Sequence, residues 1–220
     1  MKVIIIGLGN FGAALAIRLT ASGHEVIGVD KDMQKVEHFK DQITHTICMD
    51  STDANVLATL PLKDTDLVIV AIGEDIAASL MITATLKQQK VKKLVSRYIS
   101  EMQRTVVEAI GVDEIVSPEE DSAERLARRL NIEGVVDSFE VSEDYTIVEA
   151  EVPGRYVQKS IADCKFRENY KINIVTVVRP WEGQKDKGRA LGVVTPATVL
   201  EAKDILVLFG HVSDIEKLLQ

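Results

Sequence analysis

The fold class of this chain follows from residues 2–12, whose sequence is Lys-Val-Ile-Ile-Ile-Gly-Leu-Gly-Asn-Phe-Gly. The short, mostly β-branched apolar run at 2–6 predicts a strand that is buried on both faces of a parallel sheet. Glycines follow it directly at positions 7, 9 and 12, and a helical pattern begins among them. A strand, a glycine-rich turn and a helix in this order form one βα unit.

The alternation of strand and helix continues through the first half of the chain. Strands are predicted at 25–30, 46–49, 67–72, 93–97 and 113–117, and a helical segment lies before each of them. Parallel neighbours need crossover connections, and these connections are right-handed. Six such strands therefore predict an α/β domain with a doubly wound parallel sheet, which we place at residues 1–117.

The pattern changes after this domain. Ser117 suits a helix N-cap, Pro118 suits the first helical position, and Glu120 completes a capping box, so a helix is expected to begin here. After Gly134 the chain shows alternating strands, with helices expected at 158–164 and 212–219. These patterns predict a crossover helix and linker at 118–134 and a small α+β domain at 135–220.

Composition and charge exclude several classes of protein. The 220 residues carry 34 acidic and 26 basic side chains and a formal net charge of -8, which disfavours nucleic acid as a partner. The apolar runs are far shorter than the roughly 20 residues of a membrane-spanning helix, and the N-terminus lacks a secretory cleavage pattern. The two cysteines have no metal-ligand or disulfide spacing, which fits a reducing cytosol.

The glycine motif has a specific chemistry when it lies between a strand and a helix. Gly7 allows a tight turn, Gly9 lets the backbone approach a pyrophosphate, and Gly12 permits close packing of helix against strand. Asp30, at the end of the next strand, is placed to accept hydrogen bonds from both ribose hydroxyls of an adenosine and to repel a 2'-phosphate. The alternative is that the glycines only build a turn and that Asp30 only caps the following helix.

Three further strand ends meet at the same edge of the sheet, where ligands bind in folds of this class. Asp50 and Ser51 border an adenine or, alternatively, cap the next helix together with Thr52. Arg97 meets a terminal phosphate or forms an exposed salt bridge. Small residues that let a ligand pass close to the backbone end the fourth strand: Ala71, Ile72 and Gly73.

The second half of the chain carries no recognisable reaction centre. The four histidines form no acid–base arrangement, and the sequence has no Cys/His nucleophile pair, P-loop lysine or metal-ligand cluster. We therefore expect a protein that is not an enzyme. A small NAD(H)-dependent oxidoreductase remains the alternative, and it would require a general base beside the nicotinamide.

The chain resembles the cytosolic RCK proteins (regulators of potassium conductance), specifically the KtrA/TrkA-type subunits of bacterial potassium uptake systems. The resemblance covers nearly the whole length. It is carried by the opening run Val-Ile-Ile-Ile-Gly-Leu-Gly-Asn-Phe-Gly, Gly23-His24-Glu25-Val26 with Val29-Asp30, Val70-Ala71-Ile72-Gly73 with Ser79, Ile110-Gly111-Val112-Asp113, Ser117-Pro118-Glu119, Ser142-Glu143-Asp144-Tyr145 through Glu149, and Arg179, Pro196, Asp204 and Gly210.

The resemblance implies a Rossmann-like domain, a crossover helix that mediates dimerisation, and a C-terminal TrkA-C domain. It implies a regulatory subunit that binds ATP, ADP or NAD(H) and gates a separate potassium-conducting membrane protein of the KtrB or TrkH type. Such subunits form dimers that assemble into an octameric ring on the cytoplasmic face of the membrane. An orphan nucleotide sensor and a fragment of a longer channel are further alternatives, although Met1 directly before the first strand favours a free-standing subunit.

Carried over by position, the resemblance predicts a nucleotide site and a cation site. Glu119 matches a glutamate that in KtrA-type proteins holds a divalent cation, Mg²⁺ or Ca²⁺, between two facing subunits; we expect Glu120 to serve the capping box and to leave Glu119 free, and alternatively Glu119 only complements the helix dipole. The nucleotide site would be lined by Gly7, Gly9, Asn10, Phe11, Gly12, Asp30, Lys31, Asp50, Ser51, Ala71, Ile72, Gly73, Glu74 and Arg97.

Two finer expectations concern ligand identity. KtrA-like proteins commonly have arginine at the position of Asn10, where it reaches the terminal phosphate of a nucleotide in the neighbouring subunit. Asn10 is neutral and shorter, so the resemblance does not carry this discrimination of ATP from ADP to the present chain, and NAD(H) and AMP remain candidates. Arg167 and Asn173 match positions that suit cyclic di-AMP in the C-terminal domain; alternatively they belong to a strand edge and its preceding loop.

Overall fold

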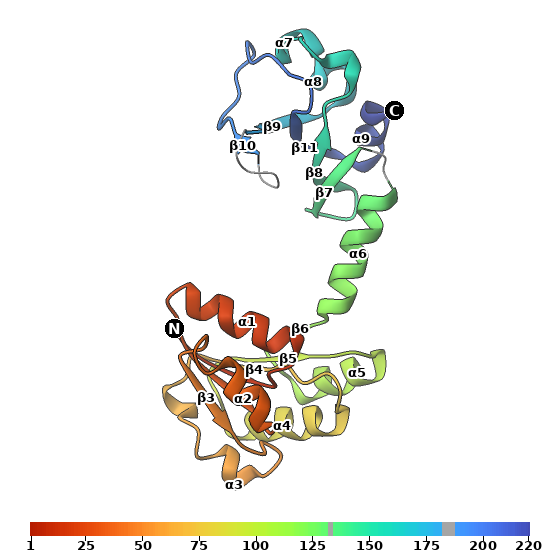
Figure 1. The fold of residues 1–220 in the computed structure, drawn as a ribbon. Helices are drawn as coiled ribbons and strands as arrows, with labels where there is room; N and C mark the ends of the chain where they lie inside the picture. The colour runs from red at the N-terminus through yellow and green to blue at the C-terminus, as the bar shows by residue number, and fades with distance from the viewer. Residues whose placement is uncertain (132–133, 182–187) are drawn as a thin grey trace. The chain divides into compact units, whose positions relative to one another are not determined.

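The computed structural model describes residues 1–131, 134–181 and 188–220, which form two compact units, Met1–Glu120 and Asp121–Gln220 (Figure 1). Each unit has its own sheet, and the hydrophobic cores of the two units share no residues. Residues 132–133 of the predicted linker lie outside the described residues.

The first unit, which is fully described, contains a six-stranded parallel sheet in the order β3-β2-β1-β4-β5-β6. This order confirms the predicted doubly wound sheet. Strands β2 and β3 are added on one side of β1, whereas β4, β5 and β6 are added on the other, and such folds bind ligands at the point between β1 and β4 where the strand order reverses. The strands are β1 (Lys2–Ile6), β2 (Glu25–Asp30), β3 (His45–Cys48), β4 (Leu67–Val70), β5 (Leu94–Arg97) and β6 (Glu114–Val116).

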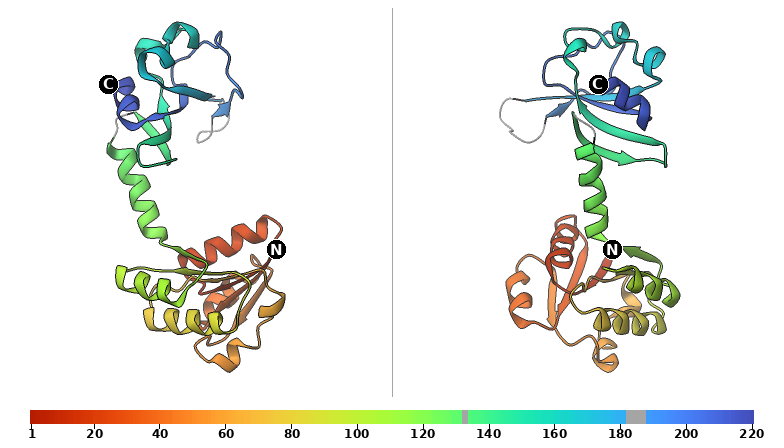
Figure 2. Two further views of the ribbon diagram at one scale, coloured as in Figure 1. Left: turned by 180° about the vertical axis from the view of Figure 1, so that it is seen from behind. Right: turned by 90° about the vertical axis from the view of Figure 1, so that its right-hand side faces the viewer.

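Helices cover both faces of this sheet (Figure 2). Alternate residues of β1 belong to two different cores: Val3 and Ile5 pack with Ala16, whereas Ile4 and Ile6 pack in the core that contains Ile82. Because side chains alternate along a strand, this arrangement explains why residues 3–6 of β1 are all apolar. The helices are α1 (Asn10–Ala21), α2 (Met33–Phe39), α3 (Ala54–Leu57), α4 (Ile76–Gln88) and α5 (Glu101–Ile110), with a 3₁₀ turn, η1 (Leu62–Asp64).

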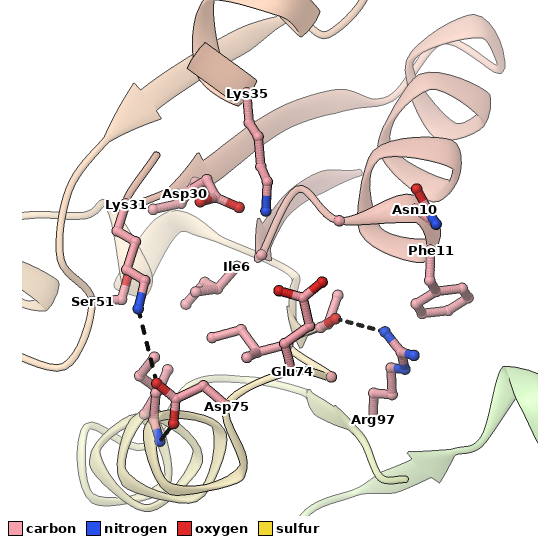
Figure 3. A pocket seen from close by; sticks show the side chains of 18 of the residues that line it. Ile6, Asn10, Phe11, Asp30, Lys31, Lys35, Ser51, Glu74, Asp75 and Arg97 are labelled. Atoms are coloured by element: carbon pink, nitrogen blue, oxygen red, sulfur yellow. Dashed lines mark hydrogen bonds and ion pairs between the residues drawn. The ribbon is translucent and has the colours of Figure 1, made fainter. Parts of the chain in front are cut away.

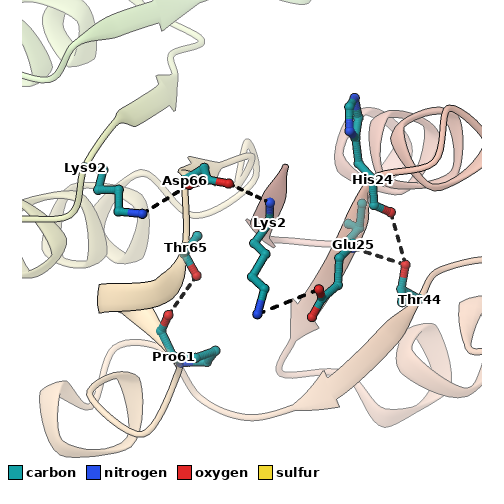
Figure 4. Close-up of polar contacts among 9 residues, drawn as sticks. Lys2, His24, Glu25, Thr44, Pro61, Thr65, Asp66 and Lys92 are labelled. Atoms are coloured by element: carbon teal, nitrogen blue, oxygen red, sulfur yellow. Dashed lines mark hydrogen bonds and ion pairs between the residues drawn. The ribbon is translucent and has the colours of Figure 1, made fainter.

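Charged side chains fix the amino-terminal edge of the same sheet (Figure 4). The carboxylate of Asp66 accepts the backbone N–H of Lys2 at 2.9 Å and the ammonium of Lys92 at 3.1 Å. The Lys2 hydrogen bond, followed by that of Lys92, lowers the pKa of Asp66 below its ordinary value. The Lys2 ammonium lies 3.8 Å from Glu25, so polar contacts join β1, β2 and the segments before β4 and β5.

Helix α6 (Pro118–Asn131) leaves the first unit, and the described strands of the second unit form an antiparallel sheet in the order β10-β9-β11-β8-β7. The strands are β7 (Val135–Glu140), β8 (Tyr145–Glu151), β9 (Asn173–Arg179), β10 (Arg189–Ala190) and β11 (Ile205–His211). Three short helical segments lie between β8 and β9, namely η2 (Gly154–Tyr156), α7 (Ile161–Cys164) and α8 (Phe166–Tyr170), and α9 (Val212–Leu219) follows β11.

The helix predicted over 158–164 is wrong in its extent. Gln158 has a φ of 65°, which is incompatible with a right-handed helix, and α7 begins only after Ser160, whose hydroxyl accepts the N–H of Asp163. Lys165 is left-handed at φ 48° and separates α7 from α8, a helix that the sequence analysis missed.

An ion pair between partly exposed Arg179 and buried Asp204 holds the loop before β11. Asp204 has no solvent exposure, and its two carboxylate oxygens each accept a 2.8 Å hydrogen bond from the guanidinium of Arg179. The same arginine donates to the carbonyl oxygen of Val199 at 3.0 Å. This bidentate pairing ties the 199–204 loop to β9. Across the part of the chain that the structure describes, no helix has both the length and the apolar character needed to span a membrane.

Candidate functional site

A cavity of 660 Å³ lies within the first unit at the carboxyl ends of its strands (Figure 3). Its size is within the range of small-ligand and cofactor sites, roughly 300–1,000 Å³. Every residue that the sequence analysis assigned to a nucleotide site contributes to its lining except Gly12: these are Gly7, Gly9, Asn10, Phe11, Asp30, Lys31, Asp50, Ser51, Ala71, Ile72, Gly73, Glu74 and Arg97. Glu119 lines it too.

The three glycines of the β1–α1 turn have different roles. Gly7 has a φ of +100°, a conformation that side chains rarely adopt. A Cβ atom on Gly12 would lie 1.9 Å from the carbonyl oxygen of Gly7, so Gly12 is where α1 packs against the turn and is not at the cavity surface. A Cβ atom on Gly9 would meet no described atom within 4 Å. Gly9 is therefore the position where the backbone is open to a ligand.

Helix α1 begins directly beside the cavity. Gly9 is its N-cap and provides no capping side chain, and Asn10 and Phe11 in its first turn both line the cavity. The first N–H groups of a helix have no partner inside the helix and carry the positive end of its dipole. This arrangement suits an anion such as a phosphate group.

The carboxylate of Asp30 is held in place by backbone groups. Its Oδ2 accepts the N–H of Leu8 at 2.7 Å, and its Oδ1 accepts the N–H of Asp32 at 2.9 Å. The N-cap of α2 is Asp32, whose side chain accepts the N–H of Gln34, so the alternative in which Asp30 caps that helix is wrong. Each carboxylate oxygen has a second lone pair, which leaves Asp30 able to accept hydrogen bonds from a ligand in the cavity.

The alternative in which the residues directly after β3 cap the next helix is also wrong. The N-cap of α3 is Asp53, whose side chain accepts the N–H of Asn55, so Asp50 and Ser51 do not cap that helix. Oδ1 of Asp50 instead accepts the hydroxyl of Thr52 at 2.6 Å and its N–H at 3.0 Å. These two hydrogen bonds, the hydroxyl's first, hold the pKa of Asp50 below its ordinary value. Asp50 is thereby a fixed anion at the cavity edge.

Arg97 is largely buried, with a side-chain exposure of 14%. The alternative of an exposed arginine in a salt bridge is therefore wrong about the exposure, although Arg97 does form a salt bridge. Its Nη1 donates to the carbonyl oxygen of Ala71 at 3.3 Å, and its guanidinium carbon lies 5.8 Å from the centre of the Phe11 ring. A Cβ atom on Gly73 would lie 2.7 Å from the guanidinium. The small residue at the end of β4 therefore makes room for this arginine.

The first turn of α6 contacts the end of β5 through two glutamates. Nη2 of Arg97 donates to the carboxylate of Glu119, and the hydroxyl of Tyr98 donates to Glu120 at 2.6 Å. The hydrogen bond to Glu120 raises the pKa of Tyr98. The expectation that Glu119 is left free is wrong, because Arg97, the last residue of β5, and Tyr98, which follows it, both reach the start of α6.

The sequence analysis missed several cavity residues on helices and loops. Lys35 of α2 points into the cavity, and the ammonium of Lys31 lies 3.9 Å from the carboxylate of Asp75 (Figure 3). Lys31 precedes the N-cap of α2 and Lys35 lies in its first turn, so no regular helical spacing relates the two lysines in the sequence. The other residues missed are Thr52, Ile99 and Pro118, with apolar Ile6, Val29, Met49, Ala78 and Ile82.

The proposed second-ligand residues lie in the second unit. Arg167 is exposed on α8, and Asn173 is half-buried at the start of β9, where it pairs with Phe209 of β11. Ile172 between them is completely buried in the core. Neither Arg167 nor Asn173 belongs to the 660 Å³ cavity, so a cyclic di-AMP site remains a prediction for these residues.

Comparison with known proteins assigns both halves of the chain. Residues 3–118 match the TrkA-N domain and residues 146–220 match the TrkA-C domain. The chain is 36% identical over 214 residues to the Ktr system potassium uptake protein C of Bacillus subtilis (strain 168) and 32% identical over 213 residues to protein A of the same system and organism. Each alignment covers 97% of this chain and 93% of the relative.

Among solved structures, the RCK domain of GsuK superposes on this chain with a TM-score of 0.67 at 19% sequence identity. The match covers 99% of this chain and 47% of that structure's chain, so the present chain spans about half of its length. At this level of identity the likeness concerns the fold.

Proposed function

The chain belongs to the protein family defined by the TrkA-N and TrkA-C domains, and from this membership we propose that it is a regulatory subunit of a bacterial potassium uptake system. The relatives from Bacillus subtilis that support this proposal are aligned over nearly their whole length, so the proposal draws on both domains and not on the nucleotide-binding fold alone. In this function the chain catalyses no reaction.

The ligand of the first unit is an adenosine nucleotide, ATP, ADP or NAD(H). The single observation that carries this proposal is the arrangement of Asp30 opposite the α1 N-terminus: an acid that is fixed by the N–H of Leu8 faces the same 660 Å³ cavity as the open backbone at Gly9. Asp30 would bind the ribose hydroxyls, and the first turn of α1 would bind the phosphates. A 2'-phosphate would be repelled by Asp30.

The partner is a membrane subunit of the KtrB or TrkH type, which this chain would contact from the cytoplasmic side as part of a homodimer-based octameric ring. In this assembly α6 is the dimerisation helix, and Glu119, with Mg²⁺ or Ca²⁺, would connect facing subunits near the nucleotide phosphates. The domain boundaries that we propose are 1–117, 118–134 and 135–220; the division of the chain into two compact units falls after Glu120, close to the first of these boundaries.

Gating requires that the nucleotide bind one conformation of the ring better than another, because a ligand with equal affinity for both shifts no equilibrium. The proposal therefore predicts different potassium fluxes with different nucleotides. The test is potassium efflux from liposomes that contain a Ktr membrane subunit and the purified chain, with ATP, ADP, NAD or NADH. An Asp30→Ala variant serves as the binding-deficient control.

A flux that depends on both the chain and the nucleotide, and that the Asp30→Ala variant no longer modulates, is the expected result. If the chain binds the membrane subunit but no nucleotide changes the flux, the regulatory role is wrong. If substrate turnover with NAD(H) is measured instead, the protein is an oxidoreductase.

A further inference from the structure

We propose that Arg97 exchanges partners when a nucleotide phosphate enters the cavity: its guanidinium gives up Glu119 and pairs with the phosphate, so that the charge of the nucleotide controls the first turn of α6. The proposal deepens the proposed function and rests on it, because it needs an adenosine phosphate in the cavity of the first unit. It differs from a role of Glu119 as a cation ligand, since it makes Glu119 a competitor of the phosphate.

The two members of the ion pair are held very differently. The side chain of Arg97 is 14% exposed, and it is confined by the Phe11 ring, the carbonyl oxygen of Ala71 and the space left by Gly73. The side chain of Glu119 is 58% exposed. Glu119 is therefore the partner that can leave, because its carboxylate turns into water while the arginine keeps its position.

The guanidinium also has an unsatisfied donor. Nε of Arg97 is buried and has no hydrogen-bond partner among the described residues. A buried N–H without an acceptor disfavours the arrangement in which it occurs. A phosphate provides three acceptor oxygens and pairs with arginine in a bidentate manner, so it can satisfy more of the guanidinium than a single glutamate contact does.

Charge makes the two partners mutually exclusive without a cation. The described residues that line the cavity include five carboxylates and three cationic side chains, so a phosphate beside Arg97 meets no surplus of positive charge. Glu119 and the phosphate then repel each other across one guanidinium. A divalent cation removes this repulsion by binding to both, and the exchange is consequently sensitive to Mg²⁺.

The neighbouring contact gives the exchange a structural consequence. Glu120 accepts the hydroxyl of Tyr98 at 2.6 Å on the same turn of α6, and Tyr98 does not line the cavity. A phosphate therefore competes for Arg97 but not for Tyr98. The first turn of α6 keeps its contact to Tyr98 and loses its contact to Arg97, which couples the charge of the nucleotide to the start of this helix.

The test is calorimetric titration of the full chain with adenosine, AMP, ADP and ATP, in EDTA and again in Mg²⁺, for the wild type and the Glu119→Gln variant. Glutamine keeps the shape of the side chain but removes the competing charge. The control is Glu114→Gln, which removes a carboxylate from the same unit. Glu114 forms a 2.8 Å ion pair with Lys93, and neither residue lines the cavity.

In EDTA we expect the Glu119→Gln variant to bind ADP and ATP about threefold to tenfold more tightly than the wild type, with adenosine unchanged. The Glu114→Gln control should bind all four as the wild type does. The affinity for ADP and ATP should increase from EDTA to Mg²⁺ by a larger factor in the wild type than in Glu119→Gln. Hydrogen exchange at the amides of residues 121–123, whose acceptors would lie in the first turn of α6, should rise when ADP binds to the wild type in EDTA, and not in the variant.

The outcomes separate this proposal from the proposed function. If the wild type binds none of the nucleotides, the nucleotide function and the exchange are both wrong. If the wild type binds them and Glu119→Gln binds ADP in EDTA equally or more weakly, only the exchange is wrong. If the nucleotide affinity of Glu119→Gln differs from that of the wild type only when Mg²⁺ is present, Glu119 is a cation ligand that does not compete with the phosphate. This result would also overturn the exchange.

Discussion

The backbone N–H of Leu8 donates a 2.7 Å hydrogen bond to Oδ2 of Asp30, so the glycine turn after β1 and the acid at the end of β2 form one hydrogen-bonded unit. The turn orients the carboxylate, and the carboxylate satisfies a backbone donor in the turn. A mutation in either element is therefore expected to affect the other. This relationship is what makes the carboxyl end of the sheet a preformed binding site and not a collection of loops.

Substitution of the glycines in this turn should separate folding from binding. In the Gly12→Ala variant the added methyl group would lie 1.9 Å from the carbonyl oxygen of Gly7, so α1 cannot pack as it does. We expect a loss of about 3 kcal/mol or more in the free energy of unfolding, measured by chemical denaturation.

The matched control is Gly9→Ala, because its Cβ would meet no described atom within 4 Å. This variant should lose no more than about 1 kcal/mol of stability. It should nevertheless bind nucleotide more weakly, since its methyl group occupies the ligand's approach to the backbone. Equal stability of the two variants would contradict the assignment of Gly12 to packing and Gly9 to binding.

The Asp204→Ala substitution should destabilise the second unit. Asp204 is fully buried and accepts two 2.8 Å hydrogen bonds from Arg179 and one from the N–H of Glu201. The Asp204→Ala substitution leaves that N–H without this acceptor and leaves Glu201 as the remaining ion-pair partner of Arg179. We expect a loss of about 3 kcal/mol in unfolding free energy. The control is Asp214→Asn, which breaks the Lys217 contact in the first turn of α9 and should lower the unfolding free energy by no more than about 1 kcal/mol. A similar midpoint for both variants would rule out a structural role for the buried pair.

The two cysteines should react at very different rates. Cys48 is exposed and Cys164 is 3% exposed, and burial raises the pKa of the Cys164 thiol. Because the thiolate is the reactive form, a thiol reagent should modify one cysteine in the native protein and two in denaturant. Rapid native modification at Cys164, identified by peptide mass, would show that the second unit opens more easily than its core packing indicates.

The same pKa shift fixes the sign of a pH effect. The folded-state pKa of Cys164 lies above that of the unfolded chain, so the buried neutral thiol contributes its full stability below about pH 8.5. This contribution is lost as the pH rises through the folded-state pKa. The unfolding free energy of the wild type should therefore fall more steeply between pH 8 and 10 than that of Cys164→Ala.

The sequence predicted the first unit well because its signals are local. Each strand is a short apolar run that ends at a polar or glycine residue, and the carboxyl ends of parallel strands meet at one edge, which brings Gly7, Asp30, Asp50 and Arg97 together. Lys35 was missed because its position depends on which side of α2 faces the cavity. The Arg97 contact to Glu119 depends on how α6 begins, and no local pattern indicates it.

The second unit was harder to predict for a different reason. Among its described residues, four backbone turns use non-glycine residues with positive φ, at Gln158, Lys165, Lys171 and Lys203, so the usual glycine signal of a helix end is absent there. As a result the predicted helix over 158–164 started too early, and α8 was overlooked. The two-residue strand β10 is too short to show an alternating pattern.

The most direct test is to measure how the unfolding free energy of the full chain changes when ATP, ADP, AMP, NAD or NADH is added. The wild type is compared with Asp30→Ala and with the control Asp53→Ala. The Asp53 side chain caps α3 and does not line the cavity. A ligand that binds only the folded protein at 100 times its Kd should stabilise it by about 2.7 kcal/mol. The account predicts stabilisation of the wild type and of Asp53→Ala by at least one of these nucleotides, and none for Asp30→Ala. The absence of stabilisation by all five, or equal stabilisation of Asp30→Ala, would contradict it.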